Sequence, residues 1–414
     1  MIANYQDALS WLMSRLPFFQ RQGAAAYKPG LERTLALMHW LDHPHKRFPT
    51  LHVGGTNGKG SVSHLLAAAL QTKGLKTGLY TSPHLYDFRE RIKINGQKIR
   101  SEFVVDFVNR FIDEAQTIDP SFFELTMAMA FDYFAQEAVD VAVIEVGMGG
   151  RLDSTNVITP VVSVITNIGW DHMQFLGDTL PKIAFEKAGI IKPEVPVVIG
   201  ELQEEVADVF KNVAQAKHAP LFFASEIYKN HSFECELKGS YQLKNTKTAY
   251  AALQLLPEML KPTEEQIRYA FAHVVQLTGL RGRWEVLSQN PLVIADTAHN
   301  FDGIQTVLKQ LEQVRKGKLY IVWGMVNDKD AIKIFTLMPK NAHYVLTTPD
   351  VPRAMPLEQL EKLATDFELS FEKKPGVPAA YQRALELAQP EDTIYVGGST
   401  FVVGDLLKHL DYGN

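Results

Sequence analysis

The stretch from Leu51 to Leu70 constrains this chain most, because an apolar strand runs into a glycine-rich loop and then into an alanine-rich helix. The loop places four glycines within seven positions, at 54, 55, 58 and 60. Glycines let the backbone turn tightly and point its N–H groups into one concavity, and the following helix N-terminus adds partial positive charge. Lys59 adds a full positive charge. The stretch therefore predicts a phosphate-binding site.

The loop departs from the common P-loop pattern. That pattern has a glycine five residues before the Gly-Lys pair and Ser or Thr directly after the lysine. Here position 53 is valine, and Gly60 separates Lys59 from Ser61. We expect Ser61 to hold Mg2+ through its hydroxyl while Lys59 neutralises the β and γ phosphates. The alternative is a glycine-rich turn capped by Ser61 with no ligand.

Composition narrows the classes of function. The chain has 414 residues, 46% of them hydrophobic and 21% charged, with a net charge of −5, which is typical of a soluble globular protein of two or three domains. A general affinity for nucleic acid or membrane surfaces is not indicated. The single cysteine, Cys235, excludes an intrachain disulfide or Cys-based zinc cluster. The chain lacks a signal-peptide pattern and a membrane span, so we expect a cytoplasmic protein.

Apolar runs alternate with helical patterns along most of the chain, which predicts an α/β fold. Helical stripes are expected at 5–16, from Pro29-Gly30 onward, at 102–136, at 246–256 after Asn245, and at 264–273. Strands are expected at 76–80, 139–146, 161–166, 195–199, 292–295, 319–323, 344–346 and 393–396. The segment 220–243 is irregular. A glycine- and arginine-containing linker at 278–284 divides domain 1–282 from domain 283–414.

A basic segment follows the second strand. Asn95-Gly96 between two short apolar runs is a two-residue hairpin signal. Five basic residues lie around it, at 89, 91, 93, 98 and 100. They predict either a solvated hairpin face or a basic lid for an anionic substrate, and the sequence leaves both open.

Three polar residues of the first domain are placed for chemistry. Glu145 ends a fully apolar run that is typical of a strand buried in a parallel sheet, and ligands bind beyond the carboxyl ends of such strands. Glu145 can therefore reach Mg2+, or else form a structural salt bridge. His172 follows the next strand, and Lys187 lies in the helix after it. His172 is expected to be functional, whereas Lys187 could also pair with Glu186 on a helix surface.

The second domain carries polar residues just past its strands. The segment 296–300 (Asp-Thr-Ala-His-Asn) follows the strand at 292–295, Gly397-Gly398-Ser399 follows the last strand, and 327–330 follows a third. Each alone reads as a turn or helix cap, which Asp, Asn, Ser and Gly favour. Three polar loops at one edge of one sheet make a binding face the stronger hypothesis.

Several long motifs resemble the folylpolyglutamate synthases, which belong with the ATP-dependent cell-wall peptide ligases. The similar segments are residues 55–61, 80–85, 122–124, 145–156, 186–192 and, with Thr297 where glycine is usual, 296–300. The resemblance covers nearly the whole chain from about Pro29. It implies an N-terminal P-loop-type ATPase domain with a mostly parallel sheet, a smaller C-terminal Rossmann-like α/β glutamate-ligase domain, and ATP held between them.

The same resemblance implies a reaction. ATP phosphorylates a folate carboxylate to an acyl phosphate, and the amine of L-glutamate then displaces phosphate to form an amide. Closing two domains over the acyl phosphate would protect it from water. Some relatives also add the first glutamate to dihydropteroate, and we expect this second activity here. The alternatives are folylpolyglutamate synthesis alone, a cell-wall peptide ligase, which would be expected to carry an additional N-terminal domain, or a nucleotide-gated switch without chemistry.

Site residues follow from the resemblance position by position. ATP would be bound by Thr56, Asn57, Gly58, Lys59, Gly60, Ser61, Asn245, Arg283 and Asp296. Mg2+ would be bound by Ser61, Ser82, Glu145, His172 and Lys187, with K+ as a possible further ion. Lys187 matches a lysine that the family carbamylates with CO2, which turns a cation into a carboxylate-like ligand. The catalytic set would be Lys59, Lys187, His172 and His299.

The folate end is implied in the same way. Gly30, Phe123 and Asp153 would line a pterin pocket, and His299 and Ser399 would serve the incoming glutamate. Lys28-Pro29 departs from the acidic-apolar pair expected before Gly30. Phe122 and Phe123 could equally be core residues, since aromatic pairs usually are. The expected partners are small molecules only, and we expect a monomer.

Overall fold

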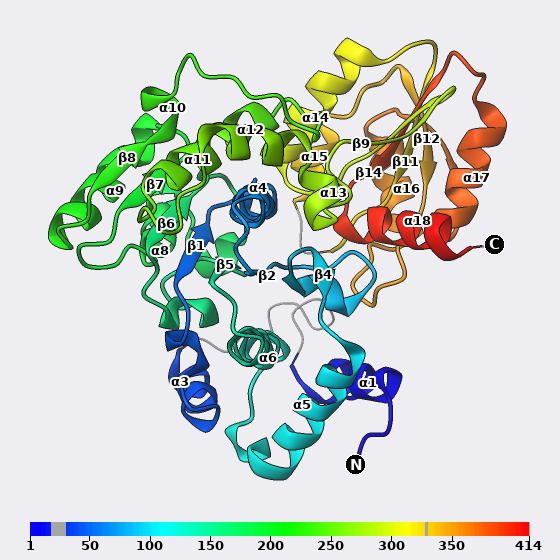
Figure 1. The fold of residues 1–414 in the computed structure, drawn as a ribbon. Helices are drawn as coiled ribbons and strands as arrows, with labels where there is room; N and C mark the ends of the chain where they lie inside the picture. Colours follow the sequence, from blue (N-terminus) through cyan, green and yellow to red (C-terminus); the bar gives the residue numbers. More distant parts are fainter. Residues whose placement is uncertain (18–29, 328–329, 414) are drawn as a thin grey trace. The chain divides into compact units, whose positions relative to one another are not determined.

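The computed structural model describes residues 1–17, 30–327 and 330–413, which divide into two compact units. Unit 1 comprises Met1–Glu236 and Tyr241–Leu280, and unit 2 comprises Leu237–Ser240 and Arg281–Asn414. The chain enters unit 2 briefly at Leu237–Ser240 and passes into it again after Leu280, within the glycine- and arginine-containing segment at 278–284. Both units are α/β, as the alternating apolar and helical patterns predict (Figure 1).

Unit 1 is built on an eight-stranded sheet with the order β4-β3-β2-β5-β1-β6-β7-β8. The six strands from β2 to β8 in this order are parallel, β3 pairs antiparallel with β2, and β4 pairs antiparallel with β3. The strands are β1 (Thr50–Gly54), β2 (Thr77–Tyr80), β3 (Ile92–Ile94), β4 (Gln97–Lys98), β5 (Val141–Glu145), β6 (Val162–Ile165), β7 (Val197–Ile199) and β8 (Leu221–Phe223).

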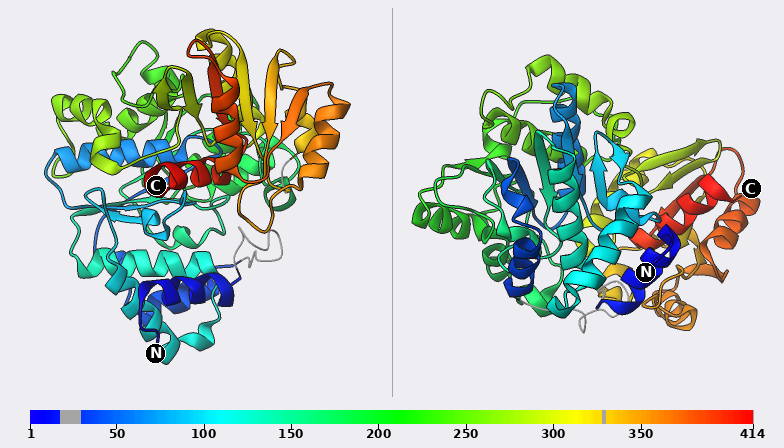
Figure 2. Two further views of the ribbon diagram at one scale, coloured as in Figure 1. Left: turned by 90° about the vertical axis from the view of Figure 1, so that its right-hand side faces the viewer. Right: turned by 60° about the horizontal axis from the view of Figure 1, so that its bottom comes forward.

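The helices of unit 1 form two groups around this sheet. Helices α4 (Lys59–Thr72), α11 (Gln242–Gln254) and α12 (Glu264–Ala272) pack together, with α13 (Val274–Thr278) beside α4. Helices α6 (Phe122–Gln136), α8 (Leu180–Ala188) and α9 (Glu204–Ala216) pack on the other side of the strands, as Figure 2 also shows. The remaining helices are α1 (Tyr5–Arg15), α3 (Glu32–Trp40), α5 (Ser101–Glu114), α7 (Met173–Leu176) and α10 (Ala224–Ile227), and short 3-10 turns η2 (Pro44–Lys46), η3 (Phe88–Arg91), η4 (Gln116–Ile118) and η5 (Ser154–Val157).

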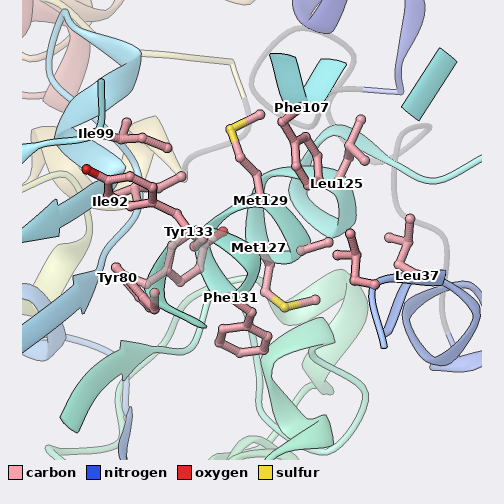
Figure 3. Close-up of a cluster of buried hydrophobic side chains, with 14 of the residues drawn as sticks. Leu37, Tyr80, Ile92, Ile99, Phe107, Leu125, Met127, Met129, Phe131 and Tyr133 are labelled. Atoms are coloured by element: carbon pink, nitrogen blue, oxygen red, sulfur yellow. The ribbon is translucent and has the colours of Figure 1, made fainter. Parts of the chain in front are cut away.

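The main core of unit 1 forms around α6. Helix α6 is predominantly apolar, and most of its residues are buried. Its side chains from Leu125 to Tyr133 contact strands β2 and β3 and helices α3 and α5 (Figure 3). Ser121 caps the helix in a capping box with Glu124, which fixes where it begins. The first turn of α6 is thereby held rigidly, and that turn carries Phe122 and Phe123.

Unit 2 has a six-stranded sheet with the order β13-β12-β11-β14-β10-β9, parallel except for β9. Its strands are β9 (Glu285–Gln289), β10 (Leu292–Ala295), β11 (Leu319–Trp323), β12 (Ala342–Leu346), β13 (Ser370–Lys373) and β14 (Thr393–Gly397). Its helices are α14 (Phe301–Val314), α15 (Ala331–Phe335), α16 (Leu357–Asp366), α17 (Val377–Leu387) and α18 (Thr400–Tyr412). The sequence patterns did not indicate β9 and β13, which are half-exposed edge strands with few strongly apolar residues.

Two expectations about elements need correction. The helix expected from 246 begins at Gln242, so Asn245 lies within its first turn instead of before it. The helix expected to open at Pro29-Gly30 begins at Glu32, with Gly30 at φ 107° just before it; residues 28 and 29 lie outside the described residues. No helix in the described part of the chain is long and apolar enough to cross a membrane.

Candidate active site

The loop at residues 54–61, here called the phosphate loop, lies between β1 and α4 and is tied to the end of β6. Thr56 N donates to Asn167 O over 2.9 Å, and Asn57 N donates to the Asn167 side chain over 2.9 Å. Gly55 has φ 132°, and a Cβ there would occupy the space of the Thr166 side chain. This position therefore requires glycine, because the loop and β6 approach too closely for any side chain.

The phosphate loop presents a helix N-terminus and a lysine to one region. Gly58 is the N-cap of α4, has φ 86° and offers no side chain to the first turn. Lys59 Nζ lies back over the loop and donates to Gly55 O at 3.1 Å and Thr56 O at 3.0 Å. A bound phosphate could take donors from both the helix terminus and this ammonium group.

A buried amide residue that the sequence did not indicate holds the back of the loop. Gln242 Nε2 donates to Ser61 Oγ over 3.2 Å, and Asn245 Nδ2 donates to Gln242 Oε1 over 2.8 Å. The Asn245 side chain also fills the space that a Cβ on Gly58 would need. Gln242 is only 2% exposed. The expected site residues Ser61, Gly58 and Asn245 are thus brought together by Gln242.

Glu145 and Ser82 meet at the carboxyl ends of neighbouring strands. Strand β2 pairs with β5 in parallel, with Tyr80 opposite Ile144, so Ser82 follows β2 close to the end of β5. Ser82 N donates to Glu145 Oε2 over 3.1 Å, and the Glu145 side chain is buried. The Glu145 carboxylate and Ser82 therefore lie next to each other at the carboxyl ends of β5 and β2. No described group of three or more His, Cys, Asp or Glu is arranged as a metal cage.

Lys187 points inward from α8 to the phosphate loop. Its Nζ donates to Gly55 O over 2.7 Å, so the ammonium groups of Lys187 and Lys59 share one carbonyl. Burial is the main cause that lowers the pKa of Lys187 to about 7, and the Lys59 charge lowers it further. The interpretation of Lys187 as a surface lysine paired with Glu186 is wrong, because Glu186 pairs with Arg151 at 2.9 Å and Lys187 is buried.

His172 lies on the loop after β6. It is the N-cap of α7 with φ 51°, and its Nε2 is 3.8 Å from Asp171 Oδ2. Its side chain is partly exposed. Asp171 in turn contributes to the electrostatic surroundings of Lys187, where its negative charge opposes the lowering of the lysine pKa. The Asp171 carboxylate therefore interacts electrostatically with both His172 and Lys187.

The residues expected to bind a pterin lie on two sides of one short segment. A Cβ on Gly147 would meet the Phe123 ring, and Met148 N donates to Asp153 Oδ2 over 2.8 Å. Phe123 is partly buried, with its ring centroid 6.0 Å from that of Tyr80. Burial raises the pKa of Asp153, while hydrogen bonds from Thr155 and from backbone N–H groups act in the opposite direction. Phe123 and Asp153 are thus brought together, whereas Gly30 is placed only before α3.

The two phenylalanines of this turn differ. Phe122 is 1% exposed, and its ring lies 5.9 Å from Phe88 and under the Arg91 guanidinium at 5.3 Å. Phe122 is therefore a core residue. Phe123 is the one of the pair whose ring is not enclosed by the core.

The basic residues around the hairpin are not all on a solvated face, and the lid alternative stays a prediction. The β3–β4 hairpin forms at Asn95-Gly96 as expected. However, Arg91 and Lys93 are buried, and Lys93 Nζ donates to Thr278 O over 2.8 Å. The other three basic residues make ion pairs: Arg89 and Lys98 with Asp87, and Arg100 with Glu137. Most charged groups of this segment therefore form ion pairs or hydrogen bonds within unit 1.

Unit 2 brings Arg283, Asp296 and Thr297 together at the end of β10. Asp296 Oδ2 accepts from Trp284 N over 2.7 Å, and its Oδ1 accepts from Ala298 N over 2.8 Å. The Arg283 guanidinium donates to Thr297 Oγ1 and to Gly282 O. His299 Nδ1 lies 3.0 Å from Thr297 O. Three predicted residues, Arg283, Asp296 and His299, therefore lie close together on two loops of unit 2, one before β9 and one after β10.

Other polar residues of unit 2 serve as helix caps. Ser399 follows β14, the neighbour of β10, and caps α18 by accepting from Phe401 N. Asn300 caps α14, and Asp330 caps α15. Asn327 N donates to Arg353 O, and residues 328 and 329 lie outside the described residues. For Asn300, Ser399 and Asp330 the cap interpretation is confirmed, which does not exclude a ligand at Ser399.

Comparison with known proteins gives a consistent result over the whole chain. Residues 53–253 match the Mur ligase middle domain, and residues 282–400 match the Mur ligase glutamate ligase domain. The dihydrofolate synthase/folylpolyglutamate synthase of Bacillus subtilis is 32% identical over 99% of this chain and 100% of its own.

Solved structures agree with these matches. The chain is similar to E. coli FolC in complex with DHPP and ADP, with a TM-score of 0.86 and 29% identity over 99% of this chain and 98% of that one. It is also similar to a bifunctional folylpolyglutamate synthase/dihydrofolate synthase with Mn, AMPPNP and L-glutamate bound, with a TM-score of 0.84 and 29% identity over the same shares of both chains.

Proposed function

The chain belongs to the dihydrofolate synthase/folylpolyglutamate synthase family of Mur ligases, and from this premise we propose how its own residues carry out the reaction. It is an ATP-dependent ligase that joins L-glutamate to the carboxylate of a folate and of dihydropteroate. The observation that carries the proposal is the buried Lys187 ammonium group, 2.7 Å from the phosphate-loop carbonyl of Gly55. A lysine placed there serves phosphate chemistry better than it serves packing.

Nucleotide binding is assigned to the phosphate loop and to groups of unit 2. Residues Thr56 to Ser61 would cradle the phosphates through backbone N–H groups, with Lys59 leaving its loop carbonyls for the β and γ oxygens. Asn245, which fills the space beside Gly58, would contact the nucleotide from α11. Arg283 and Asp296 would contribute from unit 2. Two relatives with bound ADP or AMPPNP support ATP as the nucleotide.

The residues present fit Mg2+. This ion prefers oxygen ligands, keeps several of its waters and usually takes one or two protein groups plus phosphate oxygens. Glu145, Ser82 and Ser61 would supply such oxygens, and Glu145 is buried at the end of β5 beside Ser82. When bound, the ion would offset phosphate charge. His172 is assigned to a second ion, and the expected K+ stays a prediction.

Lys187 is proposed to carry a carbamate. The neutral amine would attack CO2 and lose a proton, which leaves an N-bound carboxylate. Because the pKa of Lys187 is lowered to about 7, a large share of the amine is neutral at physiological pH. The carbamate would exchange a buried cation for an anion beside Lys59 and so remove the like-charge contact. It would also give the metal site the further carboxylate that Glu145 alone does not provide.

The protein groups then act on two successive displacements. A folate carboxylate oxygen attacks the γ phosphorus and ADP leaves; Lys59 and Arg283 are assigned to stabilise the charge that develops on the phosphate oxygens. The glutamate amine attacks the acyl carbon and phosphate leaves. His299 and Ser399 are assigned to hold the glutamate. Phe123 and Asp153 are assigned to hold the pterin, by stacking and hydrogen bonding respectively.

The proposal is tested by substrate-dependent ADP release. Purified protein with ATP, Mg2+ and L-glutamate is assayed separately with dihydropteroate and with a reduced folate monoglutamate, and turnover with both is expected. Turnover with the folate alone would leave a folylpolyglutamate synthase without the second activity. ADP release independent of glutamate would contradict ligation and favour a nucleotide switch. We also propose that the enzyme is a monomer, which its mass from sedimentation would test. We propose a cytoplasmic location.

A further inference from the structure

A chain of buried hydrogen bonds runs from strand β1 to the Asp153 carboxylate. Thr155 Oγ1 lies 2.5 Å from Asp153 Oδ1, and His52 Nε2 lies 2.8 Å from Thr155 Oγ1. His52 and Thr155 are both 0% exposed. His52 is two residues before Gly54, so this chain starts on the strand that leads into the phosphate loop.

The direction of each hydrogen bond follows from the chemistry of the groups. An ionised carboxylate only accepts, so the Thr155 hydroxyl donates its proton to Asp153. The Thr155 oxygen must then accept from His52, which requires the proton of the imidazole to be on Nε2. Burial lowers the pKa of His52 to about 3, so the ring is neutral and carries one proton. The order His52, Thr155, Asp153 is therefore the one that satisfies the donors.

These bonds fix how the carboxylate is turned. Asp153 Oδ1 accepts from both Thr155 N, at 3.0 Å, and Thr155 Oγ1, while Oδ2 accepts from Met148 N. The two backbone N–H groups hold one oxygen each, and the Thr155 hydroxyl adds a second contact on Oδ1, so three donors together restrict rotation of the carboxylate plane. A rigid carboxylate recognises a flat partner with two parallel N–H donors better than a rotating one does, because less orientational freedom is lost on binding.

The segment that carries Asp153 has other anchors. Asn156 Nδ2 donates to Arg151 O and Gly189 O, at 3.1 and 3.2 Å, and Lys192 Nζ donates to Asn156 O over 2.8 Å. The backbone of the segment is therefore held without the Thr155 hydroxyl. The role left for that hydroxyl, and for His52 behind it, is to orient the carboxylate.

We propose that Thr155 and His52 are positioning residues that set the affinity for the pterin edge by fixing the orientation of Asp153. The inference rests on the proposed function, since it takes Asp153 as the group that meets the amino and ring N–H donors of the heterocycle. It adds two residues, one of them on β1, to the determinants of pterin binding.

The test compares two substitutions of Thr155. Thr155→Val is close in shape but lacks the hydroxyl, whereas Thr155→Ser keeps it. We expect the KM for dihydropteroate to rise about tenfold in Thr155→Val, with the KM for ATP unchanged, and to return to near the wild-type value in Thr155→Ser. His52→Phe, which lacks the donor to Thr155, is expected to act in the same direction with a smaller effect.

A matched control separates orientation from simple loss of a buried hydrogen bond. Ser163 is 0% exposed and its hydroxyl donates to Ile190 O over 2.9 Å on the neighbouring strand β6. Ser163→Ala should lower the melting temperature about as much as Thr155→Val does, yet leave the KM for the pterin unchanged. An equal rise in KM for pterin and ATP in Thr155→Val, or an unchanged KM for both, would overturn the inference.

Calorimetry of dihydropteroate binding in the presence of ADP measures the pterin affinities of wild type, Thr155→Val and Thr155→Ser without turnover. Wild-type protein that binds the pterin but releases no ADP with glutamate would contradict the proposed ligase. The pterin affinities of wild type and Thr155→Val could still be compared in that case, and they would still test this inference. Wild-type protein that binds and turns over, with Thr155→Val binding equally well, would overturn this inference alone. Wild-type protein that binds no pterin would overturn the inference and remove the pterin substrate as well.

Discussion

The carboxyl edges of the two sheets use their polar residues differently. In unit 1, buried ionisable side chains bond groups of other segments: Lys187 donates to Gly55 O, to which Lys59 also donates, and Glu145 accepts from Ser82 N. In unit 2, the corresponding residues mainly bond their own backbone, where Asp296 accepts from Trp284 N and Ser399 caps α18. The buried ionisable groups of unit 1 thus connect separate segments at the sheet edge, whereas the polar groups of unit 2 hold the loops around β10 and β14.

This difference changes what each side chain can do. Burial beside another cation lowers the pKa of Lys187 to about 7, so this group has a reactivity that an exposed lysine lacks. Among the described residues, the Arg283 guanidinium donates to two uncharged groups, Thr297 Oγ1 and Gly282 O, and it is half-buried. We infer that unit 1 supplies tuned groups and that unit 2 supplies a charge for binding. The predictions below test that division.

The largest effect is expected for Lys187. Lys187→Ala should lower kcat by about 10³-fold, because it removes the group proposed to complete the metal site beside the transferring phosphate. The control is Lys182→Ala on the same helix, an exposed lysine paired with Asp178 at 2.7 Å, which should change kcat less than twofold.

Carbamylation of Lys187 has its own readout. With ¹³C-labelled bicarbonate, NMR should show a carbamate carbon in the wild type and none in Lys187→Ala. The signal should weaken below about pH 7, since the amine is then protonated and cannot attack CO2. A wild type without this signal, yet fully active in CO2-depleted buffer, would contradict the carbamate.

Arg283 is expected to give the next largest effect. Arg283→Ala should lower kcat/KM for ATP by about 10²-fold while the free energy of unfolding changes by less than about 0.5 kcal/mol. Arg281→Ala is the matched control. Because Arg281 pairs with Glu285 and Asp411, its loss should lower the melting temperature while kcat/KM for ATP changes little. If the melting temperature of Arg283→Ala fell strongly and turnover stayed unchanged, unit 2 would supply no charge to the reaction.

A smaller effect is expected at Gln242. Gln242→Leu removes the donor to Ser61 and the acceptor for Asn245 while keeping a similar size. Groups that orient a metal ligand typically change metal affinity by about 10- to 100-fold, and we expect the Mg2+ concentration for half-maximal activity to rise by about tenfold. A variant with unchanged Mg2+ dependence would show that the Gln242–Ser61 contact only supports packing.

The smallest effect separates the two adjacent phenylalanines. Phe123→Leu should weaken dihydropteroate binding by about fivefold through lost stacking, with little change in melting temperature. Phe122→Leu should do the reverse and lower stability by about 1 kcal/mol, because Phe122 is enclosed in the core. Equal losses of binding in both variants would contradict the assignment of Phe123 to the pterin.

The sequence predicted features whose cause is local. The phosphate loop, the Asn95-Gly96 hairpin and the alternating strands each depend on a short run of residues, and the structure has all three. Arg91 and Lys93 were misjudged because charge alone does not show whether a side chain turns inward.

Gln242 and His52 could not be identified from the sequence. Their partners lie 181 and 103 residues away along the chain, and a single Gln or His in a regular element gives no local signal. Ser399 and Asn300 show the converse limit, because a residue type that caps helices is also one that binds ligands.

Transfer of oxygen tests the central claim most directly. Dihydropteroate labelled with ¹⁸O in both carboxylate oxygens is turned over with ATP, Mg2+ and L-glutamate, and the released phosphate is analysed by mass spectrometry. An acyl phosphate formed by attack of the carboxylate on the γ phosphorus predicts one labelled oxygen in each phosphate released with product. Phosphate that carries no label while the amide forms would contradict the acyl-phosphate mechanism.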